Sequence, residues 1–482
     1  MNITTLSILF IVVYLVLDFI HKNKKLSKYD PPGATALSLL GNLHQIGSQP
    51  HKGLENMAKK FGPVFRFWIG DRYAVVLSDP NIIKEINVKQ FDNFTYRAIS
   101  PTFDVMSRWS ADLTLARDER WHHVRKLMSN AFTKTKLRAY TIVIDEQLDH
   151  LMLQMNNFMK NKQPFYPRKY LHKYSLNMIL SMMYSEEIPQ EEGQEGRMAT
   201  LFPPMEIILK QLGTANLGDY INILRPLRAL NYKIFGSETE KLYQISEKIY
   251  IEHVETLMRI SPRDLLDNLI IDSKGEEDKE SVIIVCNHFL MAGSDTCAST
   301  VEIFMFMINN PDIQEEMATE LARVVGKGNR ASVEHRPECP ISNAVIKEVM
   351  RIIPVAPLSL PRQAKESIII ADKYFIPKGA MVINNHRAVH HNTDHWDHPE
   401  KFMPQRFLDD GETHNDFLLP FSSGPRNCVG QNLAIEEVFV ACANNVHAFK
   451  LNSIDGKPVN EDEVFGLTIQ PNLFQVCLEA RS

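Results

Sequence analysis

Residues 420–445 read PFSSGPRNCVGQNLAIEEVFVACANN, and this stretch says more about the protein than any other part of the chain. Cys428 lies in a loop rich in glycine and arginine, just before a segment with helical periodicity. Gly424 and Gly430 allow a tight turn, and the N-terminus of a following helix stabilises a thiolate. From this stretch alone, Cys428 fits a disulfide, a metal ligand or a buried structural cysteine.

Composition narrows these alternatives. The chain has 482 residues, of which 44% are hydrophobic and 23% charged, as in a globular protein with a large core. Its formal net charge is −5, so we expect no nucleic-acid partner. The six cysteines include no C-x-x-C pair, and such a long chain does not resemble a disulfide-rich secreted domain. We therefore expect a reducing compartment and no disulfide at Cys428.

The N-terminus is apolar. Residues 3–20, ITTLSILFIVVYLVLDFI, form a run of about 18 residues, long enough to span a thin or tilted bilayer, and a lysine-rich segment follows. Because the lysines lie on the C-terminal side of this run, the positive-inside tendency places the rest of the chain in the cytosol. We predict a transmembrane anchor over 1–21, a basic and proline-rich linker over 22–35, and one large domain over 36–482.

Periodicity predicts a mainly α domain with small β-sheets (α+β). Residues 51–62 read as a helix that Gly62 ends, and residues 63–79 read as a hairpin. Long helical periodicities dominate from about residue 118 to 326, and short strand-like segments return over 366–384 and 465–480. We find no internal repeat and no domain boundary in this body.

The longest apolar helix is predicted over 277–310. Gly293, Ser294 and Asp295 are poor helix formers, and they stand in its middle. They fit either the end of one helix with a new N-cap, or small residues that a reaction requires at this place. Residue patterns alone do not separate the two.

The pattern F-x-x-G-x-R-x-C-x-G over 421–430 resembles that of the haem-thiolate monooxygenases, the cytochromes P-450 of the membrane-anchored eukaryotic type. The resemblance implies haem b (iron protoporphyrin IX), buried between the long central helix and the cysteine loop. It implies that Cys428 is the axial ligand of the haem iron. The other loop residues that it assigns to haem binding are Phe421, Gly424, Arg426 and Gly430.

The same resemblance gives roles to residues of the central helix. Asp295 would relay protons, and Thr296 would donate a hydrogen bond to dioxygen, which makes these two residues the predicted catalytic pair. Ala292 and Gly293 would leave space for dioxygen, next to a local bulge in the helix. Many members of the family have threonine or serine where this chain has Cys297.

Further motifs agree with this family. Glu348 and Arg351 are three residues apart, hence on one helix face, and by itself such a pair is ordinary surface chemistry. The resemblance adds Arg406 and implies a buried network that locks the fold. It also implies that the haem propionates are held by Trp121, Arg125, Arg362 and Arg426.

Five histidines lie within residues 384–402, and their density raises the question of a zinc site. Asn, Asp and Pro within the segment disfavour a helix, and it contains neither a cysteine nor H-E-x-x-H. We therefore predict a solvated, hydrogen-bonded segment that binds no metal.

The resulting prediction is a membrane-bound oxidoreductase that inserts one atom of O2 into a lipophilic organic substrate. No nucleotide-binding fingerprint is present, so the resemblance implies electrons from NADPH through a flavoprotein reductase in the endoplasmic reticulum membrane. Lys126 and Lys134 are candidate docking residues for this reductase. Apolar side chains in the expected pocket segments 96–113 and 200–224, and in the turns 355–360 and 467–472, indicate the lipophilic substrate.

Two alternatives remain at this point. One is a haem-thiolate isomerase or dehydratase that acts without activating O2. The other is a non-catalytic haem-binding or lipid-binding membrane protein. The retained pair of Asp295 and Thr296 argues against both, because neither alternative needs a proton relay.

Overall fold

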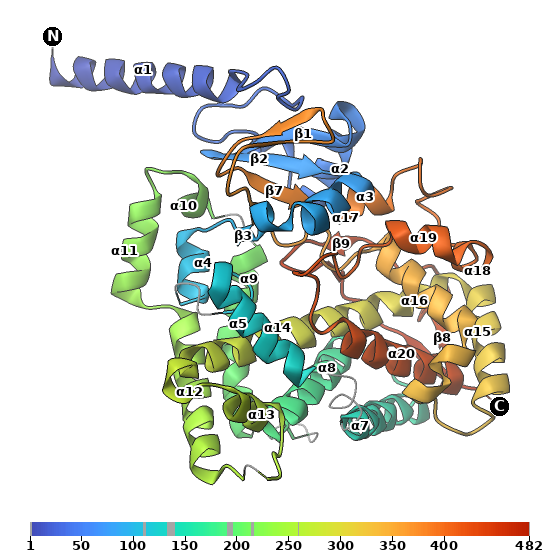
Figure 1. Ribbon diagram of the computed structural model, residues 1–482. Helices are drawn as coiled ribbons and strands as arrows, with labels where there is room; N and C mark the ends of the chain where they lie inside the picture. The colour runs from blue at the N-terminus through green and yellow to red at the C-terminus, as the bar shows by residue number, and fades with distance from the viewer. Residues whose placement is uncertain are drawn as a thin grey trace.

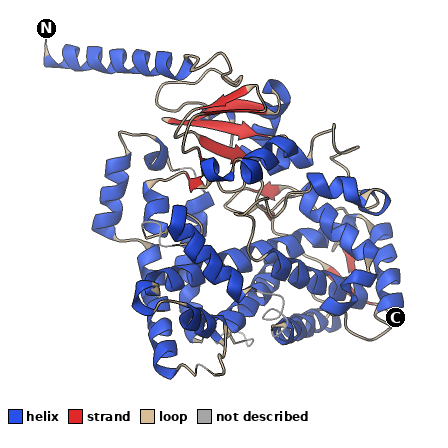
Figure 2. Ribbon diagram, in the orientation of Figure 1, coloured by secondary structure: helices blue, strands red, loops and turns tan. Residues whose placement is uncertain are grey.

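A mainly helical body carries a smaller β-rich part on one side, and a single helix extends from that side (Figures 1 and 2). This architecture agrees with the predicted fold class. The computed structural model describes residues 2–108, 112–132, 140–189, 196–213, 216–258 and 260–481.

Helices make up most of the body. Those of the N-terminal half are α1 (Ile3–Asn23), α2 (Pro50–Phe61), α3 (Pro80–Lys84), α4 (Pro101–Met106), α5 (Asp118–Ala131), α7 (Thr141–Lys160), α8 (Pro167–Tyr184), α9 (Phe202–Gly213), α10 (Leu217–Tyr220), α11 (Arg225–Phe235) and α12 (Glu238–Thr256). Those of the C-terminal half are α13 (Leu265–Asp272), α14 (Lys279–Phe304), α15 (Pro311–Val324), α16 (Pro340–Ile352), α17 (His386–His390), α18 (Arg406–Asp409), α19 (Gly411–Phe417) and α20 (Gln431–Ala448).

The main sheet has five strands in the order β1-β2-β7-β4-β3. Its strands are β1 (Val64–Ile69), β2 (Arg72–Leu77), β3 (Tyr96–Arg97), β4 (Arg362–Gln363) and β7 (Met381–Asn384). The predicted hairpin over 63–79 is confirmed as β1 and β2, which pair antiparallel, and β7 joins β2 in parallel. The three two-stranded sheets pair β5 (Ile368–Ile370) with β6 (Tyr374–Ile376), β8 (Phe449–Asn452) with β11 (Cys477–Ala480), and β9 (Glu463–Val464) with β10 (Gln470–Pro471).

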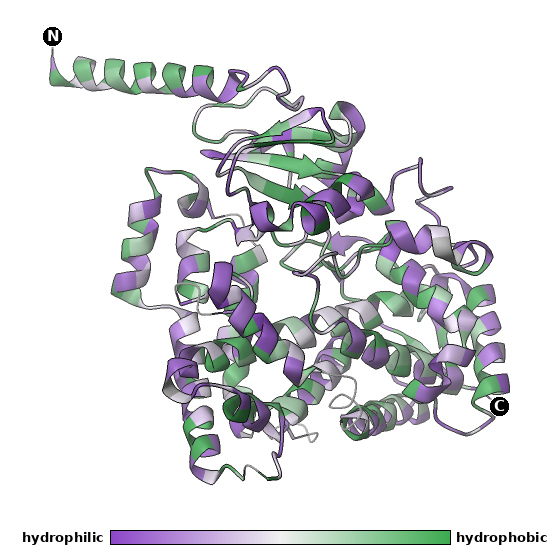
Figure 3. Cartoon of the chain, in the orientation of Figure 1, coloured by the Kyte–Doolittle hydropathy of each residue, from purple (hydrophilic) through white to green (hydrophobic). Residues whose placement is uncertain are grey.

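Helix α14 crosses the middle of the body and packs against α8 and α20 (Figure 1). Most of its side chains are buried, because apolar residues occur on every face of the helix. Among the described residues, two helical stretches are long and apolar enough to cross a membrane: α1, and Lys279–Asn309, which contains α14. The second is mostly buried and is therefore a core helix, whereas α1 is exposed and hydrophobic along nearly its whole length (Figure 3).

The end of α1 is bound to the body. The helix continues to Asn23, past the predicted anchor end at residue 21. Lys22 is 1% exposed, and its Nζ lies 2.7 Å from Asp18 Oδ2 and 2.8 Å from Asp71 Oδ1. The Asn23 side chain bonds both the backbone N–H and the carbonyl of Ala36, at 2.9 Å each. The first residues of the predicted linker therefore connect α1 to the sheet.

Candidate active site

The cysteine loop lies between α19 and α20 and is held by its own backbone. The N–H of Cys428 donates to the carbonyl of Phe421 at 3.0 Å, and that of Asn427 donates to Gly424 at 2.9 Å. Gly424 has φ +76°, and a Cβ there would collide with the carbonyl oxygen of Asn87. Glycine is therefore required at 424, both by the backbone conformation and by the close approach of another segment.

The Cys428 thiol faces two opposing influences. Its side chain is exposed at the wall of the site, yet the surrounding protein raises the pKa of the thiol by desolvation. The backbone N–H of Gly430 and the charge of Arg125 act in the other direction and favour the thiolate. Helix α20 begins at Gln431, so its positive end also lies close to the sulfur. This environment suits a thiolate bound to a metal ion.

Three arginines from distant parts of the chain are buried close to one another. Arg97 on β3 pairs in register with Arg362 on β4, and Arg426 comes from the cysteine loop. Burial lowers the pKa of Arg97 to about 10. Burial and the charge of Arg97 lower the pKa of Arg362 to about 9, and burial and the charges of its arginine neighbours lower the pKa of Arg426 to about 8. Only Asp112 counteracts this effect for Arg97 and Arg426 among the described residues. The cluster carries more positive charge than the surrounding protein balances.

The hydrogen bonds of this arginine cluster go to backbone carbonyls. Arg362 donates to the carbonyl of Phe94 at 3.1 Å, and Arg97 donates to the carbonyl of Leu360. Arg426 donates to the carbonyl of Thr114 at 3.0 Å and also to the carbonyl of Ala116. The Nε atoms of Arg97 and Arg426 are buried and have no partner in the described structure. Buried charges are normally paired. A ligand with two carboxylates, as haem b has, would supply the missing charge and acceptors.

Arg97 was not predicted from the sequence. It lies in a segment without a recognisable motif, and it comes next to Arg362 only through the pairing of β3 with β4. Arg97 belongs to the predicted pocket segment 96–113, where a lone arginine offers no local signal of this kind.

Helix α5 supplies Trp121 and Arg125, four residues apart on one face as predicted. The guanidinium of Arg426 lies over the Trp121 ring, 4.7 Å from its centroid. Arg125 donates to the carbonyl and to the side-chain oxygen of Asn427, at 2.9 Å each. Arg125 thus holds the residue before Cys428, and its contact with a propionate stays a prediction.

On α14, Ala292 and Thr296 share a face that opens toward the site. Ala292 is exposed although most of the helix is buried, and the Thr296 hydroxyl donates to the Ala292 carbonyl at 2.7 Å. Phe289, one turn before Ala292, lies 3.9 Å from where a Cβ on Gly430 would stand, which brings this face near the cysteine loop. The predicted bulge is wrong, since α14 is a regular helix from Lys279 to Phe304.

Gly293 has a different role from the predicted one. A Cβ at this position would lie 2.7 Å from Cδ1 of Ile179 on α8. Its small size therefore lets α8 and α14 approach each other, and the space next to Thr296 depends on Ala292.

Asp295 points away from Thr296. Its carboxylate is buried against the last strands, where the Thr468 hydroxyl donates to Oδ2 and the Gln470 amide donates to Oδ1 at 3.0 Å. Nδ1 of His172 on α8 lies 4.0 Å from the same Oδ1. The structure thus places the predicted acid and alcohol on two different sides of α14.

Cys297 is buried behind α14. Burial and the neighbouring carboxyl of Glu437 on α20 raise the pKa of its thiol. Burial also raises the pKa of Glu437 to about 8, and Ser175 donates to this carboxyl at 2.6 Å. Cys297 therefore faces the core, and its difference from threonine or serine does not alter the open face of the helix.

Comparisons with known proteins agree with this geometry. The sequence model of the family "Cytochrome P450" matches residues 31–478. The chain belongs to the cytochrome P450 family. It is 38% identical to "Probable cytochrome P450 519E1" of Dictyostelium discoideum, over 98% of this chain and 99% of that protein. It is 36% identical to "Probable cytochrome P450 519B1" of the same organism, over the whole of both chains.

A solved structure adds the fold. The zebra fish cytochrome P450 determined with abiraterone superposes with a TM-score of 0.77 at 26% identity, covering 90% of this chain and 100% of that one. The chain is therefore an oxidoreductase of the monooxygenase type, and like its family it uses haem b and O2. NADPH is the usual electron source in this family, through a reductase.

The Glu348 network of this P450 is fully buried. Arg351 donates to both carboxylate oxygens of Glu348, at 2.7 and 2.8 Å, and Arg406 Nε lies 3.3 Å from one of them. The remaining donors of Arg351 reach the carbonyls of His390 and Pro399 at 2.8 Å. Because every partner is protein, these residues join α16 to the segments around α17 and α18.

The histidine segment differs from its prediction. His386–His390 form the short helix α17, capped by the Asn385 side chain, and the segment there is buried rather than solvated. Burial lowers the pKa of His386 to about 4, and Nε2 of His390 accepts the backbone N–H of Leu419 at 2.8 Å. The cap and the packing of α17 on α2 and α16 outweigh the local signals against a helix. Of the five histidines, His398 lies 3.6 Å from Glu400 Oε1, and the group of possible metal ligands in the described residues lies elsewhere.

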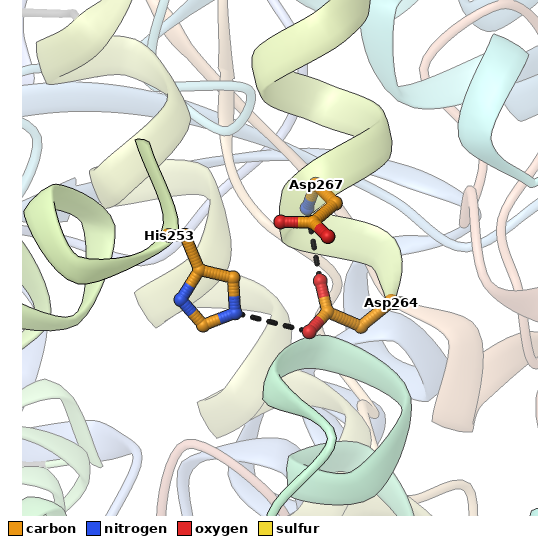
Figure 4. Close-up of side chains that lie close together, drawn as sticks. All are labelled: His253, Asp264 and Asp267. Atoms are coloured by element: carbon orange, nitrogen blue, oxygen red, sulfur yellow. Dashed lines mark hydrogen bonds and ion pairs between the residues drawn. The ribbon is translucent and has the colours of Figure 1, made fainter. Parts of the chain in front are cut away.

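One cluster of possible metal ligands exists in the described part of the P450: His253, Asp264 and Asp267, whose ligand atoms lie within 4.8 Å of one another (Figure 4). Each already has a protein partner. Asp264 accepts from the Asp267 N–H at 2.9 Å and lies 3.0 Å from His253 Nε2, while Arg263 binds both oxygens of Asp267 at 2.8 Å. The cluster therefore fixes the start of α13.

Proposed function

We propose that this P450 is a membrane-bound monooxygenase that inserts one atom of O2 into a lipophilic organic substrate, with electrons from NADPH through a separate flavoprotein reductase. The observation that carries the proposal is the unbalanced cluster of Arg97, Arg362 and Arg426 beside the Cys428 loop. A thiol and three buried guanidiniums match the iron and the two carboxylates of haem.

Each group of site residues then has its own role. Cys428 would ligate the iron, and the arginine cluster would bind the propionates. Haem held in this way supplies the activation of dioxygen. Thr296 would present its hydroxyl from the open face of α14, and Asp295 would hold a proton behind it. Phe421, Gly424 and Gly430 would keep the loop in shape around the sulfur.

The test is the absorption spectrum of the reduced, carbon-monoxide-treated protein. The wild type should have a strongly red-shifted Soret band, and Cys428→Ser should lose it. Cys477→Ser, a change at another exposed cysteine, is the matched control and should retain the band. Haem without the shift in the wild type would remove Cys428 as ligand, and folded protein without haem would overturn the proposal.

Membrane attachment is supported by two exposed apolar surfaces. One is α1, the proposed anchor over 1–21 that precedes the linker 22–35 and the catalytic domain 36–482. The other is the apolar stripe of α11, formed by Leu227, Leu230, Ile234 and Phe235, which are 63%, 50%, 62% and 79% exposed. We place the protein in the endoplasmic reticulum membrane with its catalytic domain in the cytosol.

The two surfaces are joined through one residue. Asp71, in the turn between β1 and β2, binds Lys22 of α1 at 2.8 Å and accepts the N–H of Asn222, just before α11, at 2.8 Å. This joint supports a fixed relation between α1 and the α11 stripe, as simultaneous insertion into one membrane requires.

The reductase is proposed to dock on the side of the cysteine loop. Lys126 is exposed on α5, next to the residue that holds Asn427. Lys134 lies outside the described residues. A Lys126→Glu variant should slow electron transfer, more at low than at high ionic strength, and an unchanged rate would remove this residue from the interface.

The proposal of a lipophilic substrate is based on the side chains of the predicted pocket segments. Phe103 and Met106 of α4 and Val355 after α16 belong to or pack on the apolar core, whereas Phe202 of α9 is exposed. The N–H of Ile469 donates to the Val355 carbonyl at 2.8 Å, which brings the C-terminal turn to the same place. Residues 109–111 and 214–215 of these segments lie outside the described part of the chain.

A further inference from the structure

Helices α8 and α14 enclose a row of polar side chains that the predicted proton relay does not explain. Arg168 and His172 stand one turn apart on α8, and Asp295 and Glu302 stand two turns apart on α14. The guanidinium of Arg168 binds both oxygens of Glu302, at 3.1 and 3.2 Å, and His172 Nδ1 lies 4.0 Å from Asp295 Oδ1. The Arg168–Glu302 pair and the His172–Asp295 pair thus lie one after the other between these adjacent helices (Figure 1).

The C-terminal segment 468–471 contacts this row of polar side chains from a third side. Thr468 and Gln470 donate to the two oxygens of Asp295, and Arg168 donates to the carbonyl of Pro471. These bonds hold the Asp295 carboxylate toward His172 and away from the face of Thr296. Asp295 therefore needs a source of protons on the α8 side.

This row of polar side chains also reaches solvent. The side chains of Asp295 and Glu302 are 9% and 1% exposed, whereas those of His172 and Arg168 are 22% and 27% exposed. His172 is the titratable group between this exposed edge and Asp295. Its Nε2 is buried and has no partner in the described structure, so one ring nitrogen faces Asp295 and the other has an unused bonding position.

We propose that His172 passes protons to Asp295, and that Thr468 and Gln470 are positioning residues that hold the Asp295 carboxylate for this transfer. The proposal rests on the proposed monooxygenase function and names the solvent side of its proton path. A proton on Nδ1 moves to Asp295, and Nε2 takes up a proton from solvent when the partly exposed ring turns toward the α8 edge, so the ring is neutral before and after and returns to its first tautomer on turning back. Rotation of the side chain, or one bridging water, closes the 4.0 Å between Nδ1 and Oδ1.

The charges around His172 agree with a neutral ring. Burial lowers the pKa of His172, Arg168 lowers it further, and Asp295 raises it. Glu302 faces Arg168, and burial raises the pKa of Glu302 to about 7. A neutral imidazole can take up a proton at one nitrogen while it releases a proton from the other, which an arginine or an amide in this place cannot do.

The experiment uses the full-length, haem-containing enzyme with wild-type sequence, His172→Phe, or His150→Phe as a control on the neighbouring helix α7. Each protein must first have the red-shifted Soret band; if the wild type lacks it, the proposed function fails before the inference is tested. Pre-reduced enzyme is then mixed with reductase, NADPH and O2. Hydrogen peroxide formation is measured, which needs two electrons and two protons per O2. We expect His172→Phe to be slower by about tenfold or more, with the electron-transfer rate unchanged, and His150→Phe to match the wild type.

A second measurement does not depend on turnover. Histidine-labelled protein in its carbon-monoxide form is titrated by NMR, with and without Asp295→Asn. Because the Asp295 charge raises the pKa of His172, the asparagine variant should lower it. An unchanged peroxide rate in His172→Phe, or an unmoved His172 pKa in Asp295→Asn, overturns the proposal. If His172→Phe does not fold, His172→Gln takes its place, since an amide fills similar space and cannot relay a proton.

Discussion

Two groups of buried arginines in the described part of the P450 differ in what surrounds them. Arg351 and Arg406 share the carboxylate of Glu348 and direct their other donors to backbone carbonyls. Arg97, Arg362 and Arg426 are equally inaccessible, yet none is hydrogen-bonded to a carboxylate in the described structure, and two of them have an unused Nε.

This difference separates structure from function. The arginines of the first group have all their charge balanced within the protein, so they hold the fold together and leave no donor for a ligand. A buried charge whose partners are incomplete costs free energy that a ligand can recover. The first group therefore joins α16 to its neighbours, and the second group marks the place of an anionic ligand.

The largest effect on folding is expected at Arg351. Arg351→Ala removes the bidentate counter-ion of Glu348 and leaves the buried carboxylate only Arg406 Nε at 3.3 Å and the N–H of Met403 at 2.9 Å, so the free energy of unfolding should fall by about 3–5 kcal/mol. Denaturant unfolding followed by circular dichroism measures this loss. A loss below 1 kcal/mol would show that Arg406 and the Met403 N–H compensate the carboxylate without Arg351, and the contrast between the two groups would lose its basis.

Arg97 should behave in the opposite way. Arg97→Met removes a charge that lacks a counter-charge, so helical content and unfolding should change little. Haem should leave about 10 to 100 times faster, since a hydrogen bond to a charged group contributes about 1.5–3 kcal/mol. Transfer of haem to an excess of a haem-free acceptor protein, followed by absorbance, gives the rate. Unfolded Arg97→Met would place this residue with the structural group instead.

The same contrast applies to two buried carboxyls, because Glu348 is bound by arginines whereas burial raises the pKa of Glu437. Its pKa of about 8 lies above the ordinary 4.5, so the folded protein keeps this proton while the unfolded chain loses it, and stability falls between these two pH values. Glu437→Gln does not titrate and should gain in relative stability by about 3–4 kcal/mol between pH 5 and pH 8, at about 1.36 kcal/mol per unit. Unfolding at pH 5 and pH 8 measures the change. Glu348→Gln is the matched variant and should be destabilised at both; equal behaviour of the two would contradict the distinction.

The smallest effect is expected at an exposed pair. Lys378 and Glu366 lie 2.8 Å apart, with side chains 67% and 71% exposed. Lys378→Ala should change the free energy of unfolding by at most about 0.5 kcal/mol, because solvent screens such pairs. A larger loss by the same denaturant assay would mean that burial is not what distinguishes the Arg351 pair.

Local patterns were sufficient for several elements. Helix α2 ends where Gly62 was expected to end it, at φ +94°, and β1 and β2 form the predicted hairpin. The loop before α20 and the apolar helix α14 follow from glycine placement and apolar periodicity, which act over a few residues. Cys428, Glu348, Arg351 and Arg406 were recognised because their spacing along the chain is itself the signal.

The sequence by itself thus determined the helical class, the anchor-like helix and the cysteine loop, since each depends on neighbours in the chain. Only the tertiary structure decided which side of α14 each residue faces, and so separated Asp295 from Thr296 and turned Gly293 toward Ile179. It also brought Arg97 to Arg362 and stabilised α17 against its local preferences. Such outcomes depend on contacts between segments far apart in the chain, whose free energy exceeds that of any local preference.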